Sequence, residues 1–593
     1  MKKMKKYMLS AALFALPLCA FSQNINPTVQ VTNDFQGKVM EVHKGELPVS
    51  VADSLLKFDW NFDYAVTDKL YRGAYDFTPY LIDTTPQAEP LKQNRLYVRA
   101  GAGYTFHPEA SLVYTPLAKS KVGLSVYDNF NGFSGNMITF EKSQGKSEVL
   151  SKGDSQKGYL YRNRLGVNGR ADFGKSELLF DAGADLLRSD SYISGSNYGA
   201  FDIKGRLNMN FAKWNLNVDA GFRRGDNIQS TASLGDFDMD ESVLDLGFGL
   251  IHRYAPGRSF EFRPSVKADF FNYYGYDGEV SNIKFPVLYR AEFSRAHLRA
   301  GVLLSLVTGS LDDGMVFLGS GDANPTHGNY LYPDLYADYV LVPQTLKVYA
   351  SLTGGAEVDQ LKDVLDERPF VQPSMTSAFF GEVVSTPYDA EVGLTGRIGA
   401  KVQYKFDLGY RKVENELAER VAYVNQPTFD PTVNTPTYFD YRSCFPEMLR
   451  VDYTLLHFDA QMDFMAERYE ARWGLTLQNS DFDPLVKAVA LPKFKAYASY
   501  TYNWNKRIYA GVTASFMGRR VQQYPLEEVP GAEDGYADKV PSYLDLGLNA
   551  EFRYNQRLSF WLRSGNLLCQ PVYQQVLFAQ KSPWFTLGLT FSL

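Results

Sequence analysis

The sequence predicts an all-β fold, a single transmembrane antiparallel β-barrel preceded by a short N-terminal segment. Three observations predict it: apolar and polar residues alternate along many segments, the chain opens with an export signal, and 15% of its 593 residues are aromatic. A soluble sheet protein can share the alternation, but its strands average about 5–6 residues. The alternating segments here are longer and match the roughly 9–11 residues that a tilted membrane strand needs.

The N-terminus has the features of a signal peptide. Four lysines within the first six residues precede an apolar stretch, and residues 20–22 form a small-x-small cleavage site. We therefore expect a signal peptide over residues 1–22. No later segment is apolar for the roughly 20 residues that a membrane helix needs, so the exported chain is secreted, periplasmic or a barrel. The net charge of -6 makes nucleic acid a poor partner.

The clearest alternation falls in a predicted hairpin over residues 201–223. Leu207, Met209, Trp214 and Val218 share one face and are expected to contact lipid. Charged and amide side chains fill the intervening positions and cannot face a dry core. They are expected to line a wet lumen. The lumen-facing candidates are Arg206, Asn208, Asn215 and Asp219 of this hairpin, with His457 and Asp459 of a later strand.

Connections of two lengths alternate along the chain, as in outer-membrane barrels with short periplasmic turns and long external loops. Tight turns are predicted at residues 173–176, 212–213, 256–257, 343–344 and 503–506. Long loops are predicted at residues 131–157, 225–241, 309–328, 359–386, 412–447 and 519–540. The count is 22 strands, or 20 without the hairpin around residues 107–109, and the even number puts both ends in the periplasm.

One predicted loop carries a helical signal. Leu361, Val364 and Leu365 recur at near-helical spacing within residues 359–368. We expect a short helix that folds over or into the mouth of the barrel.

The C-terminal region resembles the end of the barrel in TonB-dependent receptors. In that family a penultimate strand runs into an Asn-Leu-aromatic motif, a tyrosine follows, and the last strand ends on an aromatic residue. Here Asn566 and Leu567 follow a strand, Tyr573 comes next, and the final alternating strand includes Phe591. Leu568 replaces the usual aromatic residue. The resemblance covers residues 95–593 and implies an outer-membrane barrel of a Gram-negative bacterium, with about 22 strands and a role in transport.

The segment before the barrel departs from that family. Its members carry a globular plug of well over a hundred residues, whereas only residues 23–94 are available here and no plug signature is recognised. We expect a periplasmic or lumen-docked segment. Residues 29–32 resemble the motif that engages the energy-coupling protein, with an ordinary extended segment as the alternative. Within the segment 23–94, the candidate residues for docking a partner are Phe58, Trp60, Phe62, Tyr64 and Tyr71.

The sequence offers no set of residues that favours catalysis. No metal-ligand spacing, cofactor loop or nucleophile–base motif is recognised, so we expect no enzyme, metal or cofactor. His457 and Asp459 share a strand face, where a hydrolytic pair is the alternative to a solvated lumen wall. Cys444 and Cys569 fall in predicted external loops in an oxidising compartment. They are candidates for a disulfide, although their loops lie far apart in strand order.

Two functions remain open at this level. The first is a receptor-like or porin-like barrel that acts in envelope transport or ligand uptake. The second is a non-transporting barrel subunit of an outer-membrane assembly or export complex, which docks other envelope proteins through its N-terminal segment. The polar lumen and the strand count favour the first, and the missing plug favours the second.

Overall fold

The computed structural model describes the barrel region of the chain. The described residues are 95–118, 121–141, 151–191, 194–231, 235–273, 276–311, 328–370, 383–423, 427–429, 436–438, 444–482, 491–523, 537–575 and 578–593. The expected signal peptide and the segment 23–94 lie outside them. Within the described residues, no helix has the length and apolar character that crossing a membrane requires.

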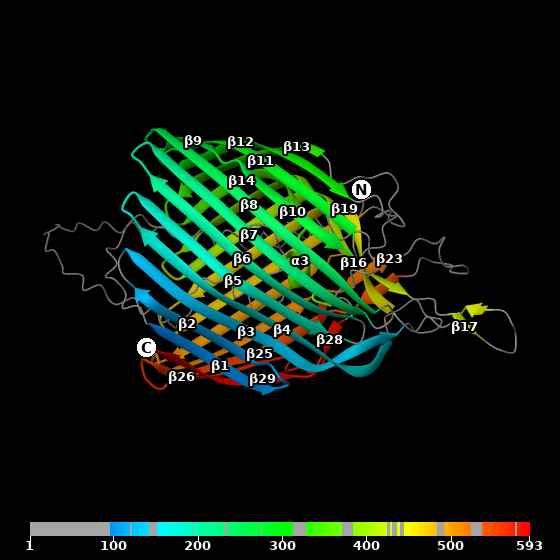
Figure 1. Ribbon diagram of the computed structural model, residues 1–593. Coiled ribbons are helices and arrows are strands. Elements are labelled where there is room, and N and C mark those ends of the chain that lie inside the picture. The colour runs from blue at the N-terminus through cyan, green and yellow to red at the C-terminus, as the bar shows by residue number, and fades with distance from the viewer. Residues whose placement is uncertain are drawn as a thin grey trace, which may run out of the picture. The chain divides into compact units, whose positions relative to one another are not determined.

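The strands close into one antiparallel barrel of 22 strands (Figure 1). Closure joins β1 to β29, with Tyr97 opposite Ser592 and Tyr104 opposite Phe585. Each remaining strand pairs with the strands before and after it along the barrel. A closed barrel leaves no sheet edge unpaired, so every backbone donor and acceptor in the lipid layer is satisfied internally.

The first half of the wall runs from β1 to β14. Its strands are β1 (Leu96–Tyr104), β2 (Glu109–Ala118), β3 (Val122–Glu141), β4 (Ser151–Asp172), β5 (Ser176–Asp190), β6 (Ser194–Asn210), β7 (Trp214–Thr231), β8 (Gly235–Ala255), β9 (Arg258–Phe262), β10 (Ser265–Tyr273), β11 (Tyr276–Glu292), β12 (Ala296–Leu311), β13 (Gly328–Val342) and β14 (Leu346–Val358).

The second half follows the one described helix, α3 (Leu361–Glu367). Its wall strands are β15 (Val383–Ile398), β16 (Val402–Tyr423), β19 (Cys444–Met465), β20 (Tyr469–Phe482), β21 (Phe494–Trp504), β22 (Ile508–Met517), β25 (Tyr543–Arg553), β26 (Leu558–Gly565) and β29 (Trp584–Ser592). Short strands in the connections are β17 (Pro427–Phe429), β18 (Pro436–Tyr438), β23 (Arg520–Gln523), β24 (Ala537–Val540), β27 (Val572–Gln575) and β28 (Phe578–Gln580).

The first hairpin forms, so the count of 22 is confirmed over 20. β1 and β2 pair from Leu96 opposite Tyr114 to Gly101 opposite Glu109. The strand predicted over residues 260–270 is instead split into β9 and β10. Pro264 lies between them and has no N–H to donate to a ladder, and β9 and β10 pair with the same two neighbours, β8 and β11.

The predicted tight turns are confirmed. Gly257 and Gln344 have φ values of 67° and 61° in the turns at residues 256–257 and 343–345. Gly174 has a φ of 86° in the turn after β4. Glycine adopts this left-handed region without a steric cost, which explains its place in two of these turns.

Several predicted loops are largely strand. β3 continues to Glu141, β7 to Thr231 and β16 to Tyr423, so the loops predicted at 131–157, 225–241 and 412–447 begin too early. Beyond the lipid layer both faces of a strand meet water or protein, and the apolar half of the alternation is no longer needed. The loss of alternation therefore marks the end of the lipid-facing band rather than the end of the strand.

The two faces of the wall differ sharply. Large apolar side chains are exposed on the outer face all around the barrel, among them Phe201, Ile203, Val302, Leu408 and Leu587. Such a continuous apolar outer surface is built to meet lipid rather than water. The neighbouring positions point inward and are largely polar, and Asp202 beside Phe201 is only 2% exposed.

Candidate functional site

A stretch of chain lies inside the barrel, and we call residues 359–370 the lumen segment. It follows β14 and contains α3, whose residues Leu361, Val364 and Leu365 are buried. Their near-helical spacing predicted a helix that folds over or into the mouth, and the structure confirms it. A helix of seven residues is not stable alone in water, so its surroundings must hold it in place.

The apolar face of α3 packs on side chains that the wall directs inward. These wall residues come from strands spread around the barrel and form one buried cluster with α3. The cluster includes Leu187, Tyr198, Met239, Phe271, Val280, Val307, Tyr332, Val358, Val383, Leu417 and Met448. The barrel therefore has a hydrophobic core within its lumen, with α3 as part of it.

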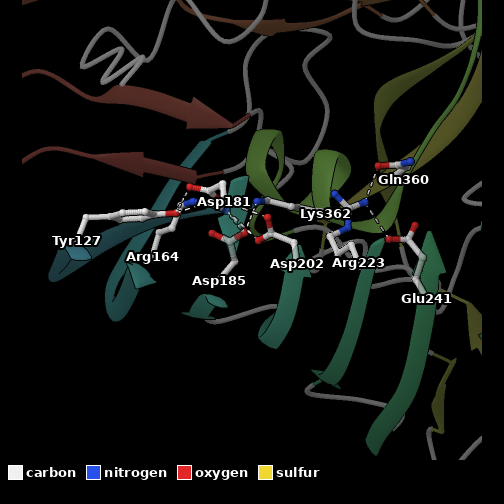
Figure 2. A network of polar contacts seen from close by, with 9 residues as sticks. All are labelled: Tyr127, Arg164, Asp181, Asp185, Asp202, Arg223, Glu241, Gln360 and Lys362. Atoms are coloured by element: carbon white, nitrogen blue, oxygen red, sulfur yellow. Dashed lines mark hydrogen bonds and ion pairs between the residues drawn. The ribbon is translucent and has the colours of Figure 1, made fainter. Parts of the chain in front are cut away.

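A first polar anchor joins α3 to β4, β5 and β6 (Figure 2). Lys362 forms an ion pair with Asp185. Arg164 lies among three carboxylates, at 3.0 Å from Asp181, 2.6 Å from Asp185 and 3.2 Å from Asp202. The positive charges of Lys362 and Arg164 are thus balanced by three carboxylates that are largely shielded from water. Each of these charges therefore has a partner of opposite sign.

A second anchor lies beside it on β7 and β8 (Figure 2). Glu241 is buried, and its carboxylate accepts a hydrogen bond of 2.7 Å from the backbone N–H of Leu361. Arg223 pairs with the other oxygen of Glu241 at 3.2 Å and donates to the side-chain oxygen of Gln360. One carboxylate therefore satisfies both a wall arginine and the first helical N–H of α3, which has no partner within the helix.

A third anchor joins the segment to β16 and β19. Asp359 pairs with Arg450 of β19 at 2.6 Å. Arg368 pairs with Glu419 of β16 at 3.4 Å and donates to the carbonyl of Leu417 at 3.0 Å. In barrel order β16 and β19 lie nearly opposite β5, so the segment spans the lumen from wall to wall.

The far end of the segment reaches the last long loop. The backbone N–H of Phe370 donates to the side-chain oxygen of Gln575 at 3.3 Å, and its ring stacks on Phe578 with 4.7 Å between centroids. Ser189 of β5 donates to the carbonyl of Pro369. The segment is thus fixed at both ends and along its length.

A cavity of about 390 Å³ opens beside the lumen segment. Its wall side comes from the loop-side ends of the strands from β15 to β25, and its other side from Val364, Glu367 and Arg368 of the segment. The volume falls within the range of small-molecule sites. The cavity therefore lies at the mouth of the barrel that carries the long loops.

The predicted lumen residues fall in two separate places. Arg206 and Asp219 form an ion pair across β6 and β7, while Asn208 lies opposite Asn217 and Asn215 opposite Asn210. Asp219 shares its strand face with Arg223, which contacts the lumen segment. These positions lie nearer the tight turns than the anchors do.

His457 and Asp459 lie on another wall strand, β19. The Nε2 atom of His457 is 3.7 Å from both Asp459 and Glu391, and Asp459 accepts a hydrogen bond from Thr476. A Cβ on Gly409, directly opposite His457, would lie 2.2 Å from the imidazole Cε1. The arrangement is a closely packed polar layer in the wall.

The structure gives no support to the candidate disulfide between Cys444 and Cys569. Cys569 is an exposed free thiol, and the side chain of Cys444 lies outside the described residues. A disulfide requires Cα atoms about 4.4–6.8 Å apart, whereas Cys444 begins β19 and Cys569 follows β26, with several strands between them in barrel order. The docking candidates Phe58, Trp60, Phe62, Tyr64 and Tyr71 lie outside the described residues.

The anchor residues themselves carry no recognisable signal in the sequence. Asp185, Arg223, Glu241 and Arg450 contact the lumen segment directly, and no motif or spacing marks them. The one sequence feature that could have indicated them is the high frequency of charged residues at alternate positions near the loop ends of neighbouring strands. A wall that faces an aqueous lumen would show the same feature. Only the position of the segment inside the barrel separates anchors from solvated residues.

No protein-family model matches the chain, and no curated protein matches it. Solved structures do match its fold. The FrpB iron transporter from Neisseria meningitidis, in its apoprotein form, aligns with a TM-score of 0.61 at 10% identity, over 85% of this chain and 82% of its own. The ferric-catecholate import receptor Fiu from E. coli K12 aligns with a TM-score of 0.57 at 10% identity, over 84% and 82%.

The copper transporter OprC aligns with a TM-score of 0.58 at 11% identity, over 85% of this chain and 81% of its own. At this level of identity the likeness concerns the fold. The chain thus has the barrel fold of TonB-dependent receptors, as the C-terminal motif implied, and the architecture of a Gram-negative outer-membrane protein.

Proposed function

We propose that this protein is a non-enzymatic outer-membrane barrel that acts in envelope transport or ligand uptake, and that its lumen segment closes the pore. The observation that carries the proposal is the segment's attachment to opposite walls, with Lys362 paired to Asp185 and Asp359 to Arg450. A barrel of 22 strands without an obstruction encloses a wide opening. A segment of its own chain can take over the closing role that a plug has in related receptors.

The chemistry of the anchors suits a closure that can be released. The segment buries Leu361, Val364, Leu365 and Phe370, and ion pairs and hydrogen bonds to the wall supply the rest of its attachment. Where water can reach these ion pairs and hydrogen bonds, water or a charged ligand can take the place of one partner. No solvent molecule can replace a large apolar contact in the same way. The segment can therefore leave the lumen while the wall stays closed.

The N-terminal residues enter the proposal as the link to other proteins. We place residues 23–94 in the periplasm or against the lumen, with Phe58, Trp60, Phe62, Tyr64 and Tyr71 as the surface that docks a partner. The residues Arg206, Asn208, Asn215, Asp219, His457 and Asp459 form part of the polar path along the wall.

Outer-membrane permeability tests the closing role. Cells would carry either the native chain or a variant in which residues 361–369 are replaced by a Gly/Ser linker of equal length. We expect only the variant to sensitise cells to a hydrophilic antibiotic that is too large for ordinary porins. A Gly/Ser replacement of residues 312–320, which follow β12, is the matched control and should leave resistance unchanged. Equal resistance with both chains, at equal amounts of folded barrel, would contradict the proposal.

The alternative function is that of a non-transporting subunit of an assembly or export complex. The proteins that co-purify with the barrel distinguish it from a transporter. Mild-detergent purification of the native chain and of a chain lacking residues 23–90 would be compared by mass spectrometry. Stoichiometric barrel partners that are lost on deletion favour the complex subunit. A barrel purified alone from cells that show a solute-specific uptake defect favours transport.

A further inference from the structure

The cavity beside the lumen segment has an apolar side that the anchors do not explain. Its wall consists of a buried cluster and the apolar residues packed against it. The cluster comprises Val413, Val451, Tyr453 and Leu455, with Val384, Ala418, Phe482 and Leu491 against it. Such a surface favours an apolar group over water by about 25 cal/mol for each Å² that the group covers.

The acidic residues that line the cavity all have partners. Glu357 pairs with Lys284 at 3.7 Å, and Glu367 pairs with Arg368 at 3.3 Å. Asp359 pairs with Arg450 at 2.6 Å, and Glu419 pairs with Arg368 at 3.4 Å. Glu416 accepts a hydrogen bond from the hydroxyl of Tyr453. These carboxylates are therefore poor sites for a cationic ligand, which would have to displace an existing donor.

One corner of the cavity is basic. Lys495 and Arg520 both line it, and Lys495 is 9% exposed. The charge of Arg520 acts on Lys495 and on the hydroxyls of Tyr543 and Tyr573. Arg520 forms no ion pair with any acid in the described part of the chain. The charges of Arg520 and Lys495 repel each other in this partly dehydrated corner, and Asp459 offsets part of that repulsion at Lys495. An anion placed against both cations lowers the remaining cost.

The tyrosines complete this corner as hydrogen-bond donors. The rings of Tyr543 and Tyr573 lie with 6.1 Å between centroids and tilted planes. Burial raises the pKa of Tyr573, on the short loop strand β27, to about 12. Its hydroxyl therefore stays protonated at neutral pH and can donate to an anionic oxygen.

We propose that this cavity binds a small organic anion, with its carboxylate at Arg520 and Lys495 and its apolar body against the wall around Leu455 and Phe482. The inference rests on the proposed role in ligand uptake and names the chemical class of the ligand. Arg368 and Gln575 line the same cavity and hold the lumen segment. The ligand would thus sit against the contacts that fix the closing element.

Binding of 4-phenylbutyrate tests the proposal, with 4-phenylbutanol as its uncharged match. Titration calorimetry would use the full barrel in lipid nanodiscs. We expect saturable binding of the carboxylate, with the alcohol at least tenfold weaker. Arg520→Gln should weaken carboxylate binding at least tenfold and leave the alcohol unchanged. Arg520 lies on the loop hairpin β23–β24 rather than in the wall, so the barrel should still close, which heat-modifiable gel mobility verifies.

Arg188→Gln is the control, because Arg188 is an exposed arginine on β5 that does not line the cavity. It should bind 4-phenylbutyrate like the native chain. Absence of saturable binding to the native barrel, or equal binding by Arg520→Gln, would overturn the proposal. Because the readout is binding alone, its failure is distinct from a failure of the closing role, which the permeability experiment measures.

Discussion

Lys362 on the lumen helix forms an ion pair with Asp185 on β5, a residue 177 positions away in the sequence. The two side chains are 20% and 14% exposed. Neither position would be charged in a core that was simply apolar, and together they tie a connecting segment to a wall strand. This ion pair shows that the lumen segment occupies a defined position inside the barrel.

Exchanging the charges of Asp185 and Lys362 tests whether this ion pair holds the lumen segment in place. Asp185→Lys alone and Lys362→Asp alone should each loosen the segment, since each leaves like charges facing one another. The double exchange restores opposite charges at the two positions but leaves the new lysine at position 185 facing Arg164, so it should recover part of the loss, with a coupling energy of about 1–3 kcal/mol in a double-mutant cycle. Hydrogen exchange of the amides in residues 361–367 measures the opening of the segment. Additive effects of the two changes would show that the pair does not hold it.

Glu241→Gln should release the beginning of α3. The amide keeps one acceptor for the Leu361 N–H but leaves Arg223 without its counterion, and breaking a buried pair on one side costs about 3–5 kcal/mol. We expect faster proteolysis within residues 359–370 and an unchanged β-sheet signal in circular dichroism. Glu279→Gln, at an exposed position on β11, is the control. Unaltered proteolysis of Glu241→Gln would contradict this anchor.

Gly409→Ala tests the packing of the polar layer around His457. The added methyl group would overlap the imidazole, and overpacking of this kind costs about 1–3 kcal/mol. The melting temperature of the barrel should fall, and His457→Ala in the same chain should restore it. Gly221→Ala is the control, because its nearest heavy atom would lie at 3.6 Å. Equal melting temperatures for Gly409→Ala and Gly221→Ala would be inconsistent with this arrangement.

Cysteine labelling tests the two faces of the β6–β7 hairpin in a background with both native loop cysteines replaced by serine. A water-soluble maleimide should label cysteines on the polar face at least tenfold faster than those on the apolar face, which lipid covers. The polar-face sites are Arg206, Asn208 and Asp219, and the apolar-face sites are Leu207, Met209, Trp214 and Val218. Equal rates for both sets would be incompatible with a lipid-facing outer surface.

The free thiol of Cys569 gives a direct check on the last loop. Because the side chain is exposed and not part of a disulfide, it should be alkylated in the folded protein without a reductant. Cys569→Ser should remove that label. A Cys569 that becomes reactive only after reduction would show that it forms a disulfide after all.

The wall could be predicted from the sequence because its signals are local. The alternation around Leu207 and Val218 and the glycine in the turn at Gly257 each depend on residues near one another in the chain. The spacing of Leu361, Val364 and Leu365 likewise predicted α3. The strand ends beyond lipid could not be predicted, because no apolar face marks them.

The wall residues that bind the lumen segment could not be predicted, for a different reason. Asp185, Glu241 and Arg450 meet the segment only after the barrel has closed and brought β5, β8 and β19 around one lumen. Each is an ordinary charged residue at an inward position of its own strand. The same limit applies to the cavity, which Lys495 of the wall strand β21 and Arg520 of the loop strand β23 line together. Loop position alone likewise made Cys444 and Cys569 no more than candidates for a disulfide, because it does not bring two residues within bonding distance.

Single-channel conductance tests the closing role of the lumen segment most directly. The native barrel and the variant with residues 361–369 replaced by a linker would be inserted in planar bilayers under the same salt conditions. We predict a native barrel that is closed or conducts only in small, brief steps, and a variant with a large and stable conductance. A large, stable conductance in the native barrel, equal to that of the variant, would contradict the account.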